Sequence, residues 1–317
     1  METCLVAGGG GFIGSHLCKS LLDENFKVIC VDNFITGDKA NINSLTSNSN
    51  FKLLEKDIIK EKDFEAEKID YIFHLASPAS PNAKSKKSYI NFPLETLLVN
   101  SVGTYNLLEL SLKNNSKFLY TSTSEVYGDP AVSPQNEEYF GNVNPNGIRS
   151  PYDESKRFGE AITQTYFRKF NLDTRIIRIF NTYGPNMQKD DGRVVSNFIN
   201  QAIEGKSITI YGDGSQSRSF CYVTDMIEGI KKSMFSERSK GEVINLGNPN
   251  ERSILDFAKL IIKLTGSASE IVFENLPEDD PKKRRPDITK AKSLLDWEPK
   301  VGLEDGINNT IEYYKSL

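Results

Sequence analysis

Histidine is scarce in this chain of 317 residues, which has only two, His16 and His74. A histidine-built metal site draws several ligands together, and a Ser-His-Asp hydrolase needs a histidine placed as its base. Two histidines far apart in the sequence make both kinds of site poor hypotheses. We therefore expect no metal site and no catalytic triad of that type.

Cysteine and long apolar runs are also sparse. Cys4, Cys18, Cys30 and Cys221 form no C-x-x-C pair and no disulfide framework, which suits a reducing compartment. No apolar run reaches the roughly 20 residues of a membrane span, and residues 1–3 lead into a strand-like run rather than a signal peptide. We expect a cytoplasmic protein without a membrane partner.

An excess of basic residues is absent as well. The chain has 39 Lys and Arg residues and 43 Asp and Glu residues, which gives a net charge of −4. That balance argues against nucleic acid or an anionic membrane as the main partner. Hydrophobic residues make up 38% and charged residues 26% of the chain, which is typical of a soluble globular protein. At roughly 150 residues per domain, the length predicts one large or two fused domains.

Short apolar runs alternate with longer amphipathic stretches through the first 180 residues. The runs predict strands, and the stretches between them predict helices such as Gly14–Leu22, Glu95–Leu112 and Tyr152–Phe170. The predicted strands are Thr3–Ala7, Lys27–Val31, Tyr71–Leu75, Lys117–Thr121 and Thr174–Arg178. Alternation of this kind predicts an α/β fold with a doubly wound parallel sheet.

The pattern becomes irregular after Pro185, with a predicted helix at Val194–Glu204 and a short strand at Ile208–Tyr211. No long linker separates the two parts, so we expect a smaller C-terminal α/β substrate domain interwoven with the first. The predicted cofactor domain is 1–178 with a return segment at about 219–250. The predicted substrate domain is 179–218 together with 251–317.

A glycine-rich turn follows the first predicted strand and opens a helix. Gly8, Gly11 and Gly14 allow a tight turn and a close approach of backbone to a pyrophosphate, which sits at the free N–H groups of the helix. Asp32 follows at the end of the second strand, where a carboxylate binds a ribose 2′-hydroxyl and repels a 2′-phosphate. The order of these features predicts a Rossmann domain that binds NAD in preference to NADP. Asp57 is a weaker candidate for an adenine contact.

Tyr152 and Lys156 are spaced i, i+4 and so share one face of a predicted helix. A lysine ammonium close to a phenol favours the phenolate and lowers its pKa, which would make Tyr152 a base for an alcohol. Thr123 belongs to a cluster of hydroxyl side chains, Thr121–Ser124, here called the hydroxyl cluster. The cluster follows the predicted strand Lys117–Thr121, at the end of the strand where doubly wound sheets bind ligands. The three residues predict hydride chemistry at an alcohol carbon.

These motifs, together with Arg178–Pro185, resemble the extended short-chain dehydrogenase/reductase superfamily, which contains the nucleotide-sugar epimerases and dehydratases. Within it, further blocks are most similar to the UDP-glucuronate decarboxylases, or UDP-xylose synthases. Those blocks are His74–Pro81, Thr121–Pro130, Gly141–Pro145, Asp191–Phe198 and Asp279–Ile288. The resemblance covers nearly the whole chain.

The resemblance implies a three-step reaction on UDP-glucuronate. NAD oxidises C4, the resulting β-keto acid loses CO2, and C4 is reduced again to give UDP-xylose. Tyr152 is then the base, Lys156 tunes its pKa, and Thr123 is its hydrogen-bond partner. Glu125 is a further catalytic residue, and Arg284 matches an arginine that lies near the sugar carboxylate and assists proton delivery. A homodimer is expected by analogy with the superfamily.

The same resemblance implies two sets of binding residues. For NAD they are Gly8, Gly11, Phe12, Ile13, Gly14, Asp32, Asn33, Phe34, Thr36, Gly37, Asp57, Ile58, Leu75, Ala76, Tyr152 and Lys156. For the UDP-sugar they are Pro78, Ser124, Asn181, Arg193, Val194, Tyr211, Gln216, Arg218 and Arg284. Arg193 and Arg218 suit the diphosphate because a guanidinium binds phosphate oxygens in a bidentate way.

The chain departs from the family pattern at the expected sugar pocket. Asn82–Ser88 is longer and more basic than usual, and Asn91 and Glu95 stand where a tyrosine and a lysine are common; Pro151 replaces a common cysteine. Two sibling activities, a dTDP-glucose 4,6-dehydratase and a 4-epimerase, therefore stay open, although Ser124 occupies the position of the acid that a dehydratase needs. A non-catalytic NAD sensor is a further alternative.

Overall fold

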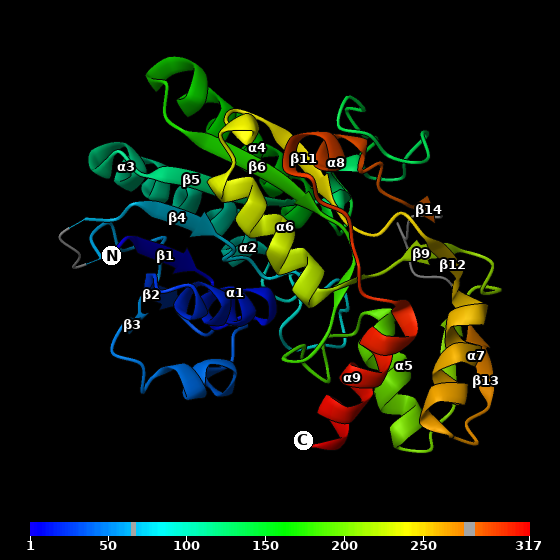
Figure 1. Ribbon diagram of the computed structural model, residues 1–317. Helices are drawn as coiled ribbons and strands as arrows, with labels where there is room; N and C mark the ends of the chain where they lie inside the picture. Colours follow the sequence, from blue (N-terminus) through cyan, green and yellow to red (C-terminus); the bar gives the residue numbers. More distant parts are fainter. Residues whose placement is uncertain (65–67, 276–282) are drawn as a thin grey trace.

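The computed structural model describes residues 1–64, 68–275 and 283–317. Seven parallel strands form its central sheet, in the order β11-β6-β5-β4-β1-β2-β3 (Figure 1). They are β1 (Thr3–Ala7), β2 (Lys27–Asp32), β3 (Phe51–Glu55), β4 (Tyr71–His74), β5 (Lys117–Thr123), β6 (Thr174–Ile179) and β11 (Val243–Leu246). This arrangement confirms the predicted doubly wound α/β fold.

Helices cover both faces of the sheet. Side chains of β1 alternate between two cores, with Cys4 and Val6 in one and Leu5 and Ala7 in the other. The first core is closed by α1 (Phe12–Asp23) and α6 (Val223–Phe235), and the second by α3 (Thr104–Asn114) and α4 (Ser150–Phe170). Strands buried on both faces are continuously apolar, which explains why their sequences were readable as short apolar runs.

The structure departs from the sequence expectations in two elements of this part. The helix expected at 95–112 is α2 (Pro93–Leu98), a π-helical turn at Val99–Gly103 and then α3. The strand β3 was not expected, because Lys52 and Glu55 are exposed and leave a short apolar signal. It lies at an edge of the sheet, with a neighbouring strand on one side only, so fewer of its side chains need to be buried.

The remaining elements gather beside the sheet, around α5 (Val194–Ile203), α7 (Ile254–Thr265) and α9 (Leu303–Lys315) (Figure 1). Helix α8 (Thr289–Leu295) is an exception, because it lies beside β11 and α6 (Figure 1). The others are β7 (Thr182–Tyr183), β8 (Ile208–Tyr211), β9 (Ser217–Ser219), β10 (Cys221–Tyr222), β12 (Glu251–Ser253), β13 (Ile271–Glu274) and β14 (Lys283–Arg284). Between them the chain returns to the sheet through α6 and β11. The residue limits of the two domains stay a prediction.

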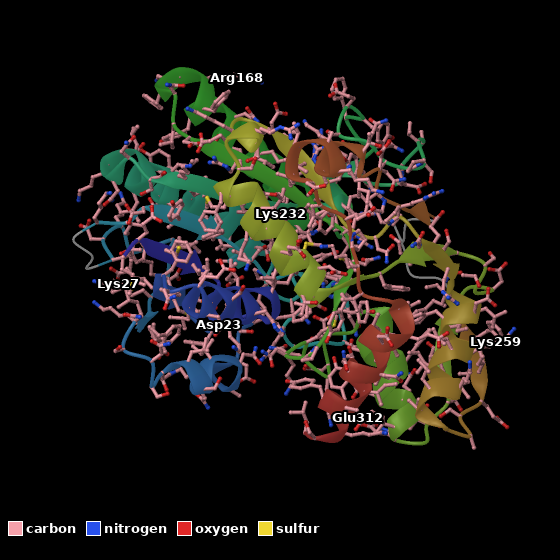
Figure 2. The ribbon with its side chains drawn as sticks, in the orientation of Figure 1. Asp23, Lys27, Arg168, Lys232, Lys259 and Glu312 are labelled. Carbon is pink, nitrogen blue, oxygen red and sulfur yellow. The ribbon has the colours of Figure 1, made fainter. Side chains whose placement is uncertain are left out.

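Charged side chains such as Lys27, Arg168 and Lys259 lie around the outside of the molecule (Figure 2). Among the described residues, no helix combines the length and the apolar character needed to cross a membrane.

The order of the strands places the site. The chain runs from β1 outward to β2 and β3, then returns to the opposite side of β1 as β4. Loops that leave neighbouring strands in opposite directions open a crevice at their carboxyl ends. The glycine turn after β1 and the hydroxyl cluster after β5 both face this crevice.

Helix α4 approaches β5 so closely that only glycine fits between them. A Cβ atom built on Gly159 would lie 2.1 Å from the Tyr120 hydroxyl oxygen, and Tyr120 is fully buried. Because Tyr152 and Lys156 stand on the same helix, this contact sets their height above the sheet.

We predict that Gly159→Ala destabilises the protein, although alanine is favoured over glycine in a helix by about 1 kcal/mol. The added methyl group overpacks a filled core, which typically costs about 1–3 kcal/mol. Urea unfolding followed by circular dichroism measures the change. Thr165→Ala, at an exposed position of α4, is the control and should change stability by less than about 0.5 kcal/mol. A gain in stability for Gly159→Ala would contradict the close packing.

Candidate active site

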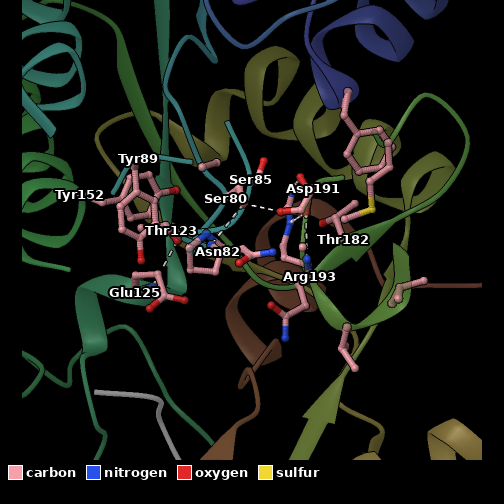
Figure 3. Close-up of a pocket in the computed structure, with 18 of the residues that line it drawn as sticks. Ser80, Asn82, Ser85, Tyr89, Thr123, Glu125, Tyr152, Thr182, Asp191 and Arg193 are labelled. Carbon is pink, nitrogen blue, oxygen red and sulfur yellow. Dashed lines mark hydrogen bonds and ion pairs between the residues drawn. The ribbon is translucent and has the colours of Figure 1, made fainter. Parts of the chain in front are cut away.

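A cavity of about 670 Å³ opens at the carboxyl ends of the central strands (Figure 3). Residues from both parts of the chain line it. Many of them are residues that the sequence predicts to bind the cofactor, to catalyse the reaction or to bind the substrate. The assigned residues on its wall are Gly8, Gly11, Phe12, Ile13, Gly14, Thr36, Leu75, Thr123, Ser124, Glu125, Tyr152, Lys156, Asn181, Arg193, Val194, Tyr211, Gln216, Arg218 and Arg284. The structure therefore brings most of the expected site together.

The other assigned residues lie outside this cavity wall: Asp32, Asn33, Phe34, Gly37, Asp57, Ile58, Ala76 and Pro78. The Ile58 side chain is buried and faces Gly103, and one Asp57 carboxylate oxygen accepts a hydrogen bond from the Ile59 N–H at 3.0 Å. Their contacts with a cofactor stay predictions. Residues 279–282 of the C-terminal block lie outside the described residues.

The glycine turn fits a dinucleotide. Gly8 has a φ of +84°, and a Cβ atom on Gly14 would lie 2.0 Å from the Gly8 carbonyl oxygen. A Cβ on Gly11, in contrast, would meet only that carbonyl, at 3.2 Å, so the space before the helix is open. Helix α1 has no side-chain cap and no acidic residue in its first turn. Its free N–H groups and dipole are available to a pyrophosphate.

Asp32 lies next to the glycine turn and fixes the backbone around it. Its two carboxylate oxygens accept hydrogen bonds from the Gly10 N–H at 2.9 Å and the Phe34 N–H at 2.8 Å. Burial raises the pKa of this carboxyl, while the two backbone donors act in the opposite direction. Each carboxylate oxygen can accept more than one hydrogen bond. The position at the end of β2 is compatible with the expected ribose contact.

The catalytic candidates meet where β5 ends under α4. The Thr123 hydroxyl shares a hydrogen bond with the Tyr152 phenol, and the Lys156 ammonium donates to the Thr121 carbonyl oxygen at 2.8 Å. The Lys156 nitrogen lies 5.8 Å from the centre of the Tyr152 ring. Base, hydroxyl partner and cation are thus adjacent, as the spacing in the sequence indicated.

The pKa of the Tyr152 phenol differs from the sequence expectation. Burial raises it to about 12, against the Thr123 hydrogen bond that lowers it. Burial also lowers the pKa of Lys156 to about 7. Desolvation therefore outweighs the attraction between phenolate and ammonium that the i, i+4 spacing implied.

Glu125 lies at the centre of a network of charged side chains next to Thr123, Tyr152 and Lys156. One of its oxygens accepts hydrogen bonds from Arg149 at 2.6 Å and from Arg284 at 3.3 Å. Arg284 also donates to the Ser124 hydroxyl at 3.1 Å and the Gly128 carbonyl at 3.2 Å. Although burial opposes ionisation, the two arginines lower the pKa of Glu125 to about 2. Glu125 is accordingly an anion held between two cations.

The polar side chains expected to hold the diphosphate line the opposite wall. Arg193 pairs with Asp191 through two hydrogen bonds, of 2.5 and 2.8 Å, which fix its guanidinium (Figure 3). Arg218 lies beside Arg284 in the paired strands β9 and β14. The Gln216 amide donates to the Tyr211 carbonyl at 2.6 Å, which holds the turn between β8 and β9.

Two wall residues escaped the sequence analysis. Tyr89 stacks on Tyr152 with ring centres 4.8 Å apart and planes 7° apart (Figure 3), and its buried hydroxyl has no hydrogen-bond partner in the described part of the chain. Arg149 lies one helical turn before Tyr152, so an i, i+3 search around the tyrosine could have found it. Tyr89 comes from a loop, where no periodicity marks the side that faces the site.

Residues 1–64, 68–275 and 283–317 contain no cluster of three or more His, Cys, Asp or Glu side chains able to hold a metal ion.

The pKa of Lys156 predicts how stability depends on pH. Because folding lowers that pKa from 10.5 to about 7, the unfolded chain binds more protons between these values, and this group makes stability rise with pH there. We expect Lys156→Met to be more stable than the unsubstituted chain at pH 7, with the difference shrinking towards pH 10. Urea unfolding without added ligand at both pH values measures it.

Lys169→Met, at an exposed position of α4, is the control and should show nearly the same small difference at both pH values. A stability difference for Lys156→Met that does not change between pH 7 and pH 10 would contradict the assigned cost of burying the ammonium.

Comparison with known proteins places this site among nucleotide-sugar enzymes. The chain is 48% identical over 311 residues to UDP-glucuronic acid decarboxylase 1 of Xenopus tropicalis, covering 98% of this chain and 72% of that protein. It is 47% identical over 305 residues to UDP-glucuronic acid decarboxylase 5 of Arabidopsis thaliana, covering 96% and 86% of the two chains.

Solved structures agree in fold over the full length. UDP-glucuronic acid 4-epimerase from Bacillus cereus, solved with UDP-glucuronic acid and NAD, superposes with a TM-score of 0.87 at 32% identity and 99% coverage of both chains. UDP-glucose 4-epimerase from Thermotoga maritima, solved with UDP-glucose, gives a TM-score of 0.90 at 32% identity, also with 99% coverage of both.

The chain also matches a known sequence family over most of its length. Residues 4–247, which include the glycine turn, the Tyr152–Lys156 pair and both arginine candidates for the diphosphate, match the NAD dependent epimerase/dehydratase family. The chain belongs to the NAD-dependent epimerase/dehydratase family.

Proposed function

We propose that the protein is an NAD-dependent UDP-glucuronate decarboxylase that forms UDP-xylose and CO2. The observation that carries the proposal is Arg284, which is buried on the cavity wall within hydrogen-bond distance of Ser124 and Glu125. It places a fixed cation beside the Thr123–Tyr152 pair, where loss of CO2 leaves negative charge. The identity of 46–49% to decarboxylases over nearly the whole chain supports the same activity.

The first step removes two hydrogens from C4 of the sugar. Tyr152 takes the hydroxyl proton as general base, and Thr123 holds the same oxygen by a hydrogen bond. The glycine turn would hold NAD, which would supply the acceptor and later the donor of the C4 hydride, and its cationic nicotinamide ring would favour the phenolate form of Tyr152. Lys156, when its amine is protonated, adds positive charge near the phenol.

Decarboxylation follows from the new ketone. C4 is then β to the carboxylate, so the C5–C6 bond breaks, CO2 leaves, and the electron pair moves into an enolate on the C4 oxygen. Arg284 stabilises that charge with its guanidinium, which Glu125 and the Gly128 carbonyl hold in place. A proton from water adds at C5 of the enolate, and Tyr152 gives its proton back to the C4 oxygen as the ketone is reduced.

The opposite wall binds the nucleotide. Arg193 and Arg218 bind the diphosphate, for which a guanidinium fork is well suited, and Asn181 adds amide donors. Tyr211 and Gln216 stand at the far side of the cavity for the uridine. Val194, at the start of α5, contributes apolar surface.

A dehydratase activity is disfavoured by Ser124. Loss of water from C6 requires an acid to protonate the leaving hydroxyl, and the Ser124 hydroxyl instead accepts a hydrogen bond from Arg284. Decarboxylation needs no such acid because CO2 leaves without a proton.

Adding carboxyl-labelled UDP-glucuronate tests the proposed function. We expect labelled CO2 and UDP-xylose in equal amounts. UDP-galacturonate without CO2 would indicate a 4-epimerase, and the absence of any product would support the non-catalytic alternative.

We also propose that the protein forms a homodimer in the cytoplasm. The four cysteines are buried free thiols, which suits a reducing compartment. Apolar side chains are exposed on three helices that lie together, with Leu97 on α2, Tyr105 on α3 and Phe158 on α4. A second copy presenting the same face would cover them in a symmetric interface.

Sedimentation equilibrium tests the dimer. We expect a mass of two chains of 35.6 kDa, and a single chain for Phe158→Glu, because a charge in an apolar interface is costly. Phe273→Glu, at an exposed position of β13, should stay a dimer. A monomer for the unsubstituted chain would contradict the proposal.

We predict that Tyr152→Phe lowers turnover by about 10²–10⁴-fold, the usual contribution of a general base. Binding of NAD and UDP should stay within about twofold, because the ring still stacks on Tyr89. Single-turnover assays and calorimetry measure the two effects, with Tyr105→Phe on the surface of α3 as the control. Turnover within threefold of the unsubstituted protein would show that another group takes the proton.

A further inference from the structure

The segment at residues 80–91, here called the basic loop, is the part of the cavity wall that departs most from the family pattern. It closes on itself, since the Tyr89 N–H donates to the Ser80 carbonyl at 3.0 Å. The Asn91 amide donates to the carbonyls of Ala83 at 3.0 Å and Ser85 at 2.7 Å. Asn91, which stands where the family often has tyrosine, therefore holds the longer loop in shape.

The basic loop spans the cavity between its two functional ends. At one end, the Ser80 hydroxyl donates to the Asp191 carbonyl, next to the Asp191–Arg193 pair. At the other end, Tyr89 stacks on Tyr152. Figure 3 shows Ser80, Asn82, Ser85 and Tyr89 running from Arg193 to Tyr152. A side chain of this loop can therefore reach a sugar that lies between the diphosphate and the base.

Two lysines of the basic loop, Lys84 and Lys87, line the cavity. Lys87 is half-buried, whereas Lys84 is exposed. Within the described ranges, neither ammonium makes a hydrogen bond or ion pair.

The other cations of the wall are engaged. Arg149 and Arg284 contact Glu125, Arg193 contacts Asp191, Arg218 donates to the Ser217 carbonyl, and Lys156 donates to the Thr121 carbonyl. Lys87 is thus the most buried cation of the wall whose three donors are all available to a ligand.

We propose that Lys87 binds the carboxylate of the uronate and sets the preference of the site for a charged sugar. The inference rests on the proposed function, since UDP-glucuronate differs from UDP-glucose only in carrying a carboxylate at C6. An ammonium on a half-buried wall pairs with a carboxylate by a charge-assisted hydrogen bond.

The position of this charge predicts a kinetic signature. The carboxylate loses its negative charge as CO2 departs, so an ion pair with Lys87 is stronger in the ground state than in the transition state for that step. Removing such an interaction raises KM and leaves kcat unchanged or higher. Removing Arg284, which stabilises charge formed during the reaction, would instead lower kcat.

Equilibrium binding to Tyr152→Phe protein, in which we expect turnover to be about 10²–10⁴-fold slower, tests the inference. Adding Lys87→Gln should weaken the binding of UDP-glucuronate about tenfold or more, as expected for a lost charge-assisted hydrogen bond. Affinity for UDP-glucose and UDP should change by less than twofold. Lys86→Gln, a neighbouring lysine outside the cavity wall, is the matched control, and Lys87→Arg should restore most of the affinity.

An equal loss of affinity for UDP would make Lys87 a diphosphate ligand and overturn the inference, as would unchanged affinity for UDP-glucuronate. With Tyr152 intact, a fall in kcat without a rise in KM for Lys87→Gln would also overturn it. Release of CO2 by the unsubstituted protein tests the proposed function separately. A chain that decarboxylates but shows no effect of Lys87→Gln contradicts only the assignment of Lys87.

Discussion

The half-buried carboxylate of Glu125 joins three segments that are far apart in the chain, and the shape of the sugar pocket depends on it. Glu125 follows β5, Arg149 precedes the first turn of α4, and Arg284 comes from β14, which pairs with β9. Because Arg284 is almost fully buried, removing Glu125 would leave it as an uncompensated buried charge, which typically costs about 3–5 kcal/mol. Because Glu125 has a pKa of about 2, the network stays charged throughout the physiological range and holds Arg284 against the cavity.

Beside this fixed charge lies Tyr152, the proposed base, which is strongly desolvated. Tyr152 is covered by the Tyr89 ring and carried by α4, whose contact with β5 at Gly159 leaves no room for a Cβ atom. Burial keeps the phenol protonated and lowers the pKa of Lys156 to about 7. Tyr152, Thr123 and Lys156 are therefore held together in a largely dehydrated part of the cavity.

Features that depend on neighbours in the sequence could be predicted, and features that depend on the tertiary fold could not. The Gly8–Gly14 turn and the Tyr152–Lys156 pair are local patterns, and the structure places both as expected. The burial that raises the pKa of Tyr152 cannot be read from a spacing of four residues. Tyr89 and the arginine partners of Glu125 come together only when distant loops fold. The edge strand β3 escaped notice because its exposed lysine and glutamate weaken the apolar signal.

The central claim is that one site oxidises C4, releases CO2 and returns the same hydride to C4. The most direct test is a single turnover of UDP-glucuronate carrying deuterium at C4, with the product analysed by NMR and mass spectrometry. The account predicts UDP-xylose that retains deuterium at C4, because the hydride that leaves is the one that comes back. UDP-xylose with hydrogen at C4, or a 4-keto sugar as the final product, would contradict it.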